Sequence, residues 1–301
     1  MRQLHHLPSA PRVLPRLKKL LSDGNSAIQD VVAMIRLDPG IAARVLQMGN
    51  SAYYGRGLRC YTVDEAVNRG GFDQGYELVA TAVASQVLVR PLAAYGVEAD
   101  ELWKMSVACG LAAETVAENA ALDRDIAYTI GLLHTVGLVA IDEWAFRHHP
   151  ELRFSPGKFP LETCEIERAS LGFHNGEAGA ALLRLWEFPS VMTEPLRWQY
   201  LPKGTASHHQ FACVLHVAKW LRTVVCHGLD NLARPDATIL RGAGLTPGRL
   251  DQLVETVSTQ LESVSSLLEN DVPERTAFAF PGGRREFDDH RITRTFIDRY
   301  V

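Results

Sequence analysis

Apolar side chains recur at helical spacing along most of this chain, whereas the strict alternation typical of β-strands is almost absent. Near the N-terminus, Val13, Leu17 and Leu21 would share one face of a helix that ends before Asp23-Gly24. Comparable stretches follow one another to about residue 268, separated by turns that contain glycine or proline. The pattern predicts an all-α protein.

Capping signals and periodicity together place the predicted helices. About five short helices precede residue 92, the last of them over residues 76–89. Three of their starts carry N-terminal capping patterns: Ser26 with Gln29, Asp38 with Pro39, and Thr62 with Glu65. Further helices are expected over residues 100–119, 123–146, 161–171, 175–187, 190–200, 207–227 and 246–268.

The change in helix length predicts how the chain is divided. Residues 1–95 are expected to form a compact N-terminal helical bundle, packed on a larger helical domain over residues 96–268. Residues 269–301 form a mixed-charge tail that contains several phenylalanines. That composition is compatible with a disordered segment and with one that packs back on the helices.

Charge and cysteine content limit the cellular compartments and the classes of partner that we expect for this protein. A net charge of −4 provides no general attraction to nucleic acid, and the five cysteines include no CxxC pair. The N-terminus lacks an apolar signal core, and the longest nearly uncharged stretch, residues 126–141, is too short to span a bilayer. We expect a cytoplasmic protein with neither nucleic acid nor membrane as partner.

Seven segments, in order, resemble the HDOD family. Three belong to the N-terminal half: LPSAPRVLPRLKKLLSD (7–23), IRLDPGIAARVLQMGNSAYYG (35–55) and TVDEAVNRGGF (62–72). Four belong to the C-terminal half: LWKMSVACGLAAE (102–114), GLLHTVGL (131–138), ERASLGFHNGEAGAALLRLWEFP (167–189) and VLHVAKWL (214–221). The resemblance implies a bacterial signalling module with an HD-like larger domain, related to metal-dependent HD phosphohydrolases but usually without their catalytic set.

The resemblance also implies where the metal ligands of an HD enzyme would fall. The first histidine is replaced by Met105, the His-Asp pair by His134-Thr135, and the distal aspartate by Lys219. A thioether binds hard divalent ions poorly, and a hydroxyl brings no negative charge. At ~4 Å and an effective dielectric constant of ~20, each unit charge is worth about 4 kcal/mol, so an ammonium in place of a carboxylate opposes a cation strongly. We therefore expect no catalytic residues, no metal and no cofactor.

Two further positions can be compared with the metal ligands of HD enzymes. His174 matches a position that some HD enzymes use for a second metal, and the histidine pair expected after the following helix is replaced by Trp198-Gln199. These residues are compatible with a vestigial cleft lined by Met105, His134, Thr135, His174, Trp198 and Lys219. In the alternative interpretation, His134 is a neutral core histidine, because Gly131 and Gly137 beside it indicate close approach of another helix.

A second candidate site lies in the N-terminal half. Asn50, Tyr53 and Tyr54 stand at the end of a predicted helix. Tyrosines suit the centre of a partner-binding surface, so these residues are a possible interface. The interpretation we favour is structural, with Asn50 satisfying the backbone at a helix end and the tyrosines packed between the two helical parts.

Three functions follow from these observations. The first is a non-catalytic regulatory module that acts in bacterial signalling by binding unidentified signalling proteins. The second is a sensor that binds a nucleotide-like anion in the vestigial cleft, with the ammonium of Lys219 as its charge partner and the indole of Trp198 as a stacking face. The third and most remote is a residual HD-type phosphohydrolase.

Overall fold

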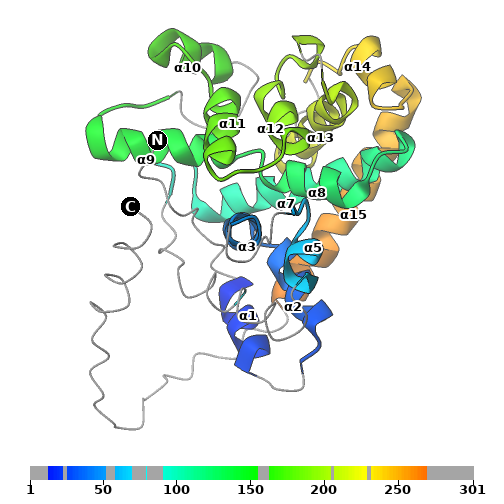
Figure 1. Cartoon of the computed structure of the whole chain (residues 1–301). Helices are drawn as coiled ribbons and strands as arrows, with labels where there is room; N and C mark the ends of the chain where they lie inside the picture. Colours follow the sequence, from blue (N-terminus) through cyan, green and yellow to red (C-terminus); the bar gives the residue numbers. More distant parts are fainter. Residues whose placement is uncertain are drawn as a thin grey trace. The chain divides into compact units, whose positions relative to one another are not determined.

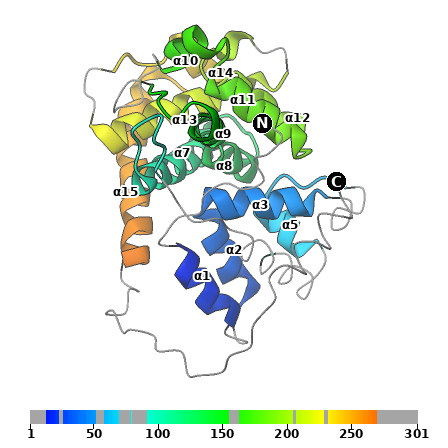
Figure 2. The same ribbon diagram turned by 90° about the vertical axis from the view of Figure 1, so that its left-hand side faces the viewer.

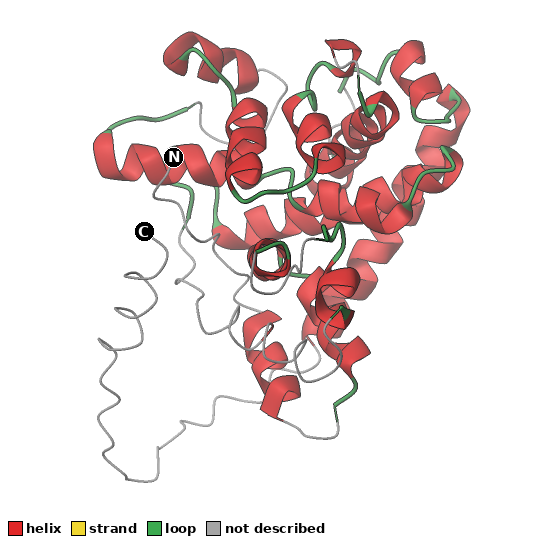
Figure 3. Ribbon diagram, in the orientation of Figure 1, coloured by secondary structure: helices red, strands yellow, loops and turns green. Residues whose placement is uncertain are grey.

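The computed structural model describes residues 13–22, 26–51, 58–69, 79, 91–154, 163–204, 207–228 and 232–269. In these ranges every regular element is a helix, and β geometry is confined to one isolated antiparallel bridge between Leu92 and Val97 (Figure 3). The prediction of an all-α fold is confirmed. All described residues fall within one compact unit, and the predicted boundary at residue 95 stays a prediction.

The N-terminal helices are α1 (Val13–Ser22), α2 (Ile28–Arg36), α3 (Pro39–Gly49) and α5 (Val63–Asn68). Helix α3 begins as predicted, because the Asp38 carboxylate accepts a hydrogen bond from the Ile41 N–H at 2.9 Å. Thr62 likewise caps α5. The capping box predicted at Ser26 is wrong, since the N-cap of α2 is Ala27 and its side chain makes no cap hydrogen bond. Nearly all of the helix expected over 76–89 lies outside the described residues.

The following helices are α7 (Ala99–Asn119), α8 (Arg124–Leu132), α9 (Val136–His148), α10 (Thr163–Leu171), α11 (Asn175–Leu185), α12 (Ser190–Arg197), α13 (His209–His227), α14 (Ala237–Gly242) and α15 (Leu250–Glu269), with 3₁₀ turns at Pro202–Gly204 and Pro247–Arg249. Helix α7 packs against α8, α13 and α15, and this set forms the centre of the core (Figure 1, Figure 2). The sequence reading missed α14, which has only six residues and therefore shows little periodicity.

Polar contacts attach the end of α2 to the larger helical part. The indole Nε1 of Trp103 donates to the Leu37 carbonyl at 2.8 Å, and the Tyr128 hydroxyl donates to the Arg36 carbonyl at 2.6 Å. The Arg36 guanidinium lies 4.5 Å from the centre of the Tyr128 ring and also pairs with Glu114 and Asp125. The last carbonyls of α2 thus find partners on α7 and α8, as helix ends require.

The single helix predicted over residues 123–146 is wrong, because the chain turns at Leu133–Thr135 and separates α8 from α9. His134 Nδ1 hydrogen-bonds the Gly131 carbonyl at 2.7 Å, so a side chain takes a carbonyl at the end of α8. The Thr135 hydroxyl hydrogen-bonds the Ser106 hydroxyl of α7 at 2.9 Å. The side chains of the turn are therefore held by α8 on one side and by α7 on the other.

The stretch Arg124–His148 is the single candidate for a membrane-spanning helix within the described part of the chain, by length and composition alone. It is longer than the apolar run expected from the sequence. However, 89% of its most apolar window is buried inside the protein. The stretch is therefore core of the helical fold, and the cytoplasmic compartment stays a prediction.

The predicted close approach of helices at Gly131 and Gly137 is confirmed. A Cβ at Gly131 would lie 2.5 Å from the Cys109 carbonyl oxygen of α7, and one at Gly137 would lie 1.8 Å from the Asn175 carbonyl oxygen of α11. Both neighbours are backbone atoms, which cannot move without shifting a helix. Glycine is thus required at both sides of the turn.

Gly137→Ala is expected to lower the free energy of unfolding by about 1–3 kcal/mol, because the new methyl group collides with the backbone at the start of α11. Equilibrium urea denaturation measures the loss. Gly248→Ala is the matched control, since nothing lies within 4 Å of its Cβ position. Equal stability of the two variants would contradict the close packing of α9 on α11.

Candidate functional site

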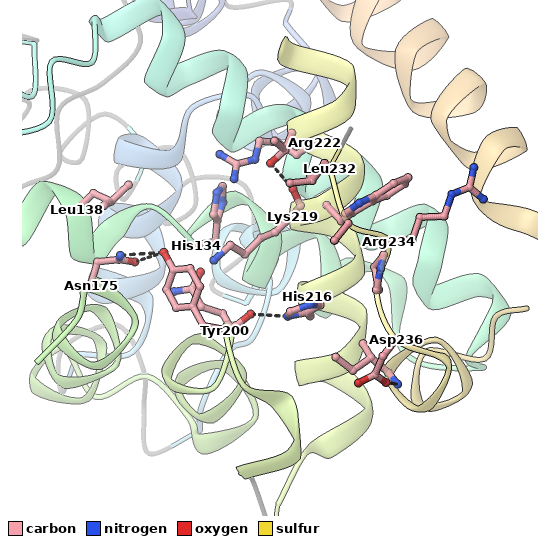
Figure 4. A pocket seen from close by; sticks show the side chains of 16 residues that line it. His134, Leu138, Asn175, Tyr200, His216, Lys219, Arg222, Leu232, Arg234 and Asp236 are labelled. Carbon is pink, nitrogen blue, oxygen red and sulfur yellow. Dashed lines mark hydrogen bonds between the residues drawn. The ribbon is translucent and has the colours of Figure 1, made fainter. Parts of the chain in front are cut away.

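A cavity of about 230 Å³ lies between the α8–α9 turn, the end of α12, helix α13 and residues 232–239. Figure 4 shows His134, Lys219, Tyr200 and Arg222 gathered at one end, with Arg234 and Asp236 at the other. The first end is buried, whereas Arg234 and Asp236 are exposed. The cavity therefore has a closed polar end and a mouth at the surface.

Lys219 is the most unusual residue of the closed end. It lies on α13, is only 7% exposed, and its Nζ stands 3.3 Å from the centre of the Tyr200 ring. No other described residue makes a hydrogen bond to this nitrogen. Burial lowers the pKa of Lys219 well below its ordinary value, and the neighbouring Arg222 guanidinium lowers it further. The cavity as it stands therefore disfavours the charged amine.

His134 faces Lys219 from the α8–α9 turn and is 3% exposed. Because a carbonyl oxygen can only accept, the Nδ1 that contacts Gly131 carries the proton. Burial, assisted by Arg222 and Lys219, lowers the pKa of His134 well below its ordinary value, so the ring is neutral at neutral pH. Its Nε2 is then a hydrogen-bond acceptor, and no group in the described ranges donates to it.

Other buried polar atoms on the cavity wall also lack partners. Within the described ranges these are Nε of Arg222, Nε1 of Trp220 and both amide atoms of Gln199. An unsatisfied buried polar group costs about 1–3 kcal/mol, so several on one wall indicate a site that is completed by something else. Most of these atoms are hydrogen-bond donors.

A hydrogen-bonded chain supports the wall behind Tyr200. The Tyr200 hydroxyl and the Asn175 side chain bond each other at 2.8 and 3.1 Å, and Asn175 donates to the carboxylate of Glu167 from its backbone N–H and from Nδ2. The Tyr95 hydroxyl donates to the other Glu167 oxygen at 2.6 Å. Glu167 is fully buried, and burial raises its pKa. Its two oxygens are thus committed to neighbours other than Lys219.

The structure brings together only part of the predicted cleft. His134 and Lys219 line the same cavity, and His174 lies beside it, where it caps α11 and packs edge-on against Tyr200 at 5.3 Å. Thr135 is turned toward Ser106 of α7.

Met105 and Trp198 are not brought into the cavity. Met105 is fully buried and lines a different groove together with Trp103 and Cys226. Trp198 does not line the cavity with Lys219, because its ring lies under Arg197 and its Nε1 donates to Glu194 at 3.3 Å. A stacking role for this indole in the cavity is therefore a wrong prediction.

Sequence reasoning missed Glu167, Tyr200 and Arg222. Arg222 follows Lys219 by three residues, so helical spacing places both on one face of α13, and two cations on an otherwise apolar face were a usable signal. Glu167 and Tyr200 are joined to the site by tertiary contacts that no local pattern shows.

Asn50 has a structural role in the second candidate site. Its Oδ1 accepts from the Cys60 N–H at 2.8 Å, and its Nδ2 donates to the Cys60 carbonyl at 3.2 Å. The residue is 6% exposed. These bonds fit the interpretation of a satisfied helix end, while Tyr53 and Tyr54 lie outside the described residues.

The residues at the HD metal position do not fit a divalent cation. No group of three or more His, Cys, Asp or Glu side chains is placed to hold a metal ion anywhere in the described ranges. The position of the distal ligand holds the buried amine of Lys219 beside the guanidinium of Arg222. Both groups oppose a cation at this position.

The helical core, with a histidine at the turn between α8 and α9, defines an HD-like helical domain, and no metal-ligand set is found among its described residues. The chain belongs to the HDOD family, whose model, described as the HDOD domain, matches residues 7–202. The predicted family is thereby confirmed.

Known proteins resemble this chain over most of its length. An uncharacterized protein of Treponema pallidum is 25% identical over 207 residues, which are 66% of this chain but only 38% of that relative. The crystal structure of the MmoQ response regulator from Methylococcus capsulatus has a TM-score of 0.64 at 18% identity and covers 83% of this chain and 98% of its own. A virulence factor of Campylobacter jejuni has a TM-score of 0.62 at 19% identity and covers 86% and 94%. At these identities the two structures support the fold alone.

Lys219→Met is expected to raise the free energy of unfolding by about 1–3 kcal/mol in phosphate-free buffer, because it removes a buried amine without a hydrogen-bond partner among the described residues. Urea denaturation of the two proteins measures the difference. Lys203→Met is the matched control, since that lysine is exposed and paired with Asp236, and its loss should cost less than about 1 kcal/mol.

The same variant is expected to change the pH dependence of stability. The pKa of Lys219 is lowered on folding, so below its ordinary value of 10.5 the unfolded chain binds a proton that the folded chain releases. Stability of the wild type therefore rises with pH, by up to about 1.4 kcal/mol per unit from this group. Lys219→Met should show a shallower rise over the pH units just below 10.5, where the unfolded chain is protonated at this position and the folded chain is not. Parallel curves would mean that Lys219 keeps its ordinary pKa.

Proposed function

We propose that this HDOD protein is a non-catalytic regulatory module that acts in bacterial signalling by binding another protein. The observation that carries the proposal is the buried Lys219, whose amine stands where an HD enzyme needs a carboxylate ligand. A centre that repels divalent cations cannot prepare a metal-bound water for hydrolysis. The helical scaffold nevertheless keeps an extensive hydrophobic core, which supports a use of the fold other than that chemistry.

The comparisons supply the signalling part of the proposal. The family resemblance implies association with two-component and cyclic-nucleotide signalling, and one structural neighbour is named a response regulator.

A second function is favoured by one specific observation. The closed end of the cavity carries several buried polar atoms without partners among the described residues, which supports a small-molecule sensor. In that function the ligand provides the input, and the change in partner binding is the output.

Purified protein, prepared without chelator, is expected to contain much less than one equivalent of Mn, Fe or Zn, as measured by plasma mass spectrometry. It should show no metal-dependent hydrolysis of a chromogenic phosphodiester, because the ligand set is missing. Stoichiometric metal, together with turnover that His134→Ala removes, would establish the remote HD-type phosphohydrolase and refute the non-catalytic proposal.

Affinity capture from a lysate of the native host is expected to recover a regulatory protein reproducibly. Gly137→Ala, which should disturb the packing of α9 on α11, is the control for nonspecific adsorption to unfolded protein. A captured candidate is then tested as a purified protein by titration calorimetry. Failure of every captured candidate to bind in that assay would count against the partner-binding proposal.

A further inference from the structure

We infer that the cavity beside Lys219 is a binding site for the phosphate group of a small molecule, held by Lys219 and Arg222 with one protonated phosphate oxygen donating to His134. The phosphate compound would be the ligand that the proposed sensor detects. Its effect on signalling therefore rests on the proposed regulatory role. Binding itself requires no partner protein.

The charge of the closed end is the first argument. Lys219 and Arg222 are 7% and 4% exposed, lie one helical turn apart on α13, and bring two basic groups into one buried space. The nearest carboxylate that stabilises the Lys219 ammonium, Glu167, is held by Tyr95 and by both donors of Asn175. Within the described residues neither basic group has a hydrogen-bonded carboxylate. An anion in the cavity would supply the missing charge and offset the cost of burial.

The pattern of donors and acceptors is the second argument, and it distinguishes one anion from another. Lys219 Nζ and Arg222 Nε are donors without partners in the described part of the chain, whereas the tautomer of His134 makes its Nε2 an acceptor. A carboxylate or a sulfate at neutral pH has no O–H to offer this nitrogen. Inorganic hydrogen phosphate has acceptor oxygens and retains an O–H at neutral pH. A phosphate monoester retains an O–H only as the monoanion, which is the minor form above its second pKa of about 6.

The size of the cavity is the third argument. Its volume of about 230 Å³ is below the range of about 300–1,000 Å³ that is usual for drug-sized ligands. A volume of this size favours phosphate itself or a small phosphate monoester over a larger ligand. At the exposed end Arg234 pairs with Asp251 and Lys203 pairs with Asp236, so these cations already have carboxylate partners, unlike the basic groups of the closed end.

Proton uptake should accompany binding. The groups around the Lys219 amine are Arg222 and His216 on its own helix, Cys109 of α7, Cys164 and Glu167 of α10, the rings of His134 and His174, and the face of the Tyr200 ring. None of them is a neighbouring free carboxylate, so a bound anion would be the strongest new stabiliser of the ammonium. Phosphate should therefore bind more tightly as the pH falls from about 8 to 6.5.

The test uses the purified full chain in phosphate-free buffer at constant ionic strength, with inorganic phosphate as the probe. Isothermal titration calorimetry should show saturable binding at about one site, and the melting temperature should rise with phosphate concentration. Sulfate should bind at least about tenfold more weakly, which corresponds to about 1.4 kcal/mol for the lost hydrogen bond to His134. Glycerol 3-phosphate is titrated separately as a representative phosphate monoester. If it binds more tightly than inorganic phosphate, the site is assigned to a monoester; if it binds more weakly, the site is assigned to free phosphate.

Two variants keep the inference falsifiable. Lys219→Met should abolish phosphate binding although it is expected to be the more stable protein, so lost binding cannot be ascribed to unfolding. Arg222→Met is the second variant, and Lys203→Met at the mouth is the control that should retain most of the affinity. The inference is overturned if neither phosphate probe binds, if Lys219→Met binds as the wild type does, or if sulfate binds as tightly as phosphate.

The phosphate site and the partner-binding role can be refuted independently of each other. Phosphate binding by the wild type, with no partner that survives the calorimetric test, would refute the partner-binding role and leave the site standing. A verified partner, with no phosphate binding, would refute the site and leave the regulatory role standing. Where both hold, addition of phosphate should change the affinity of the partner for the wild type and not for Lys219→Met.

Discussion

The hydrogen bond from His134 Nδ1 to the Gly131 carbonyl is the interaction on which the arrangement of the core depends. It ends α8, so that α8 and α9 can leave the turn in different directions and be covered by different helices. On one side Gly131 lies directly on the backbone of α7, and on the other Gly137 lies on the backbone of α11. The same bond fixes the tautomer of the ring and leaves its acceptor nitrogen facing the cavity. One contact thus sets both the packing and the chemistry of the site.

Local sequence signals placed most helices correctly but failed where a long-range contact decides the outcome. Asp38, Thr62 and Asp123 cap helices as their positions predict, because a capping bond involves only neighbouring residues. The break after Leu132 has no such signal: the apolar pattern continues through it, and the turn is stabilised by Ser106 from another helix. In the same way, His134 and Lys219 could be placed by resemblance to the family, whereas Glu167 and Tyr200 join the site through contacts between α10, α11 and the end of α12.

The buried amine of Lys219 lowers the stability of the folded protein, and this loss of stability indicates a function for the residue. Its nitrogen is stabilised by the face of the Tyr200 ring, and no described residue provides it with a hydrogen bond. A protein interior built for stability alone would place an apolar side chain here, since most of the surrounding core is aliphatic. Sites that retain unsatisfied polar groups at the expense of stability are usually sites that bind something.

Replacement of a metal ligand by a lysine changes what the HD scaffold can bind as well as what it can catalyse. A carboxylate set attracts a divalent ion, and the ion in turn attracts phosphate oxygens. With Lys219 and Arg222 in place, the positive charge is part of the protein and needs no ion to carry it. Such a site offers charge and hydrogen bonds to a phosphate but no activated water to attack it. In the proposed function, recognition would thereby be separated from hydrolysis, and a bound ligand would persist long enough to be read out by a partner.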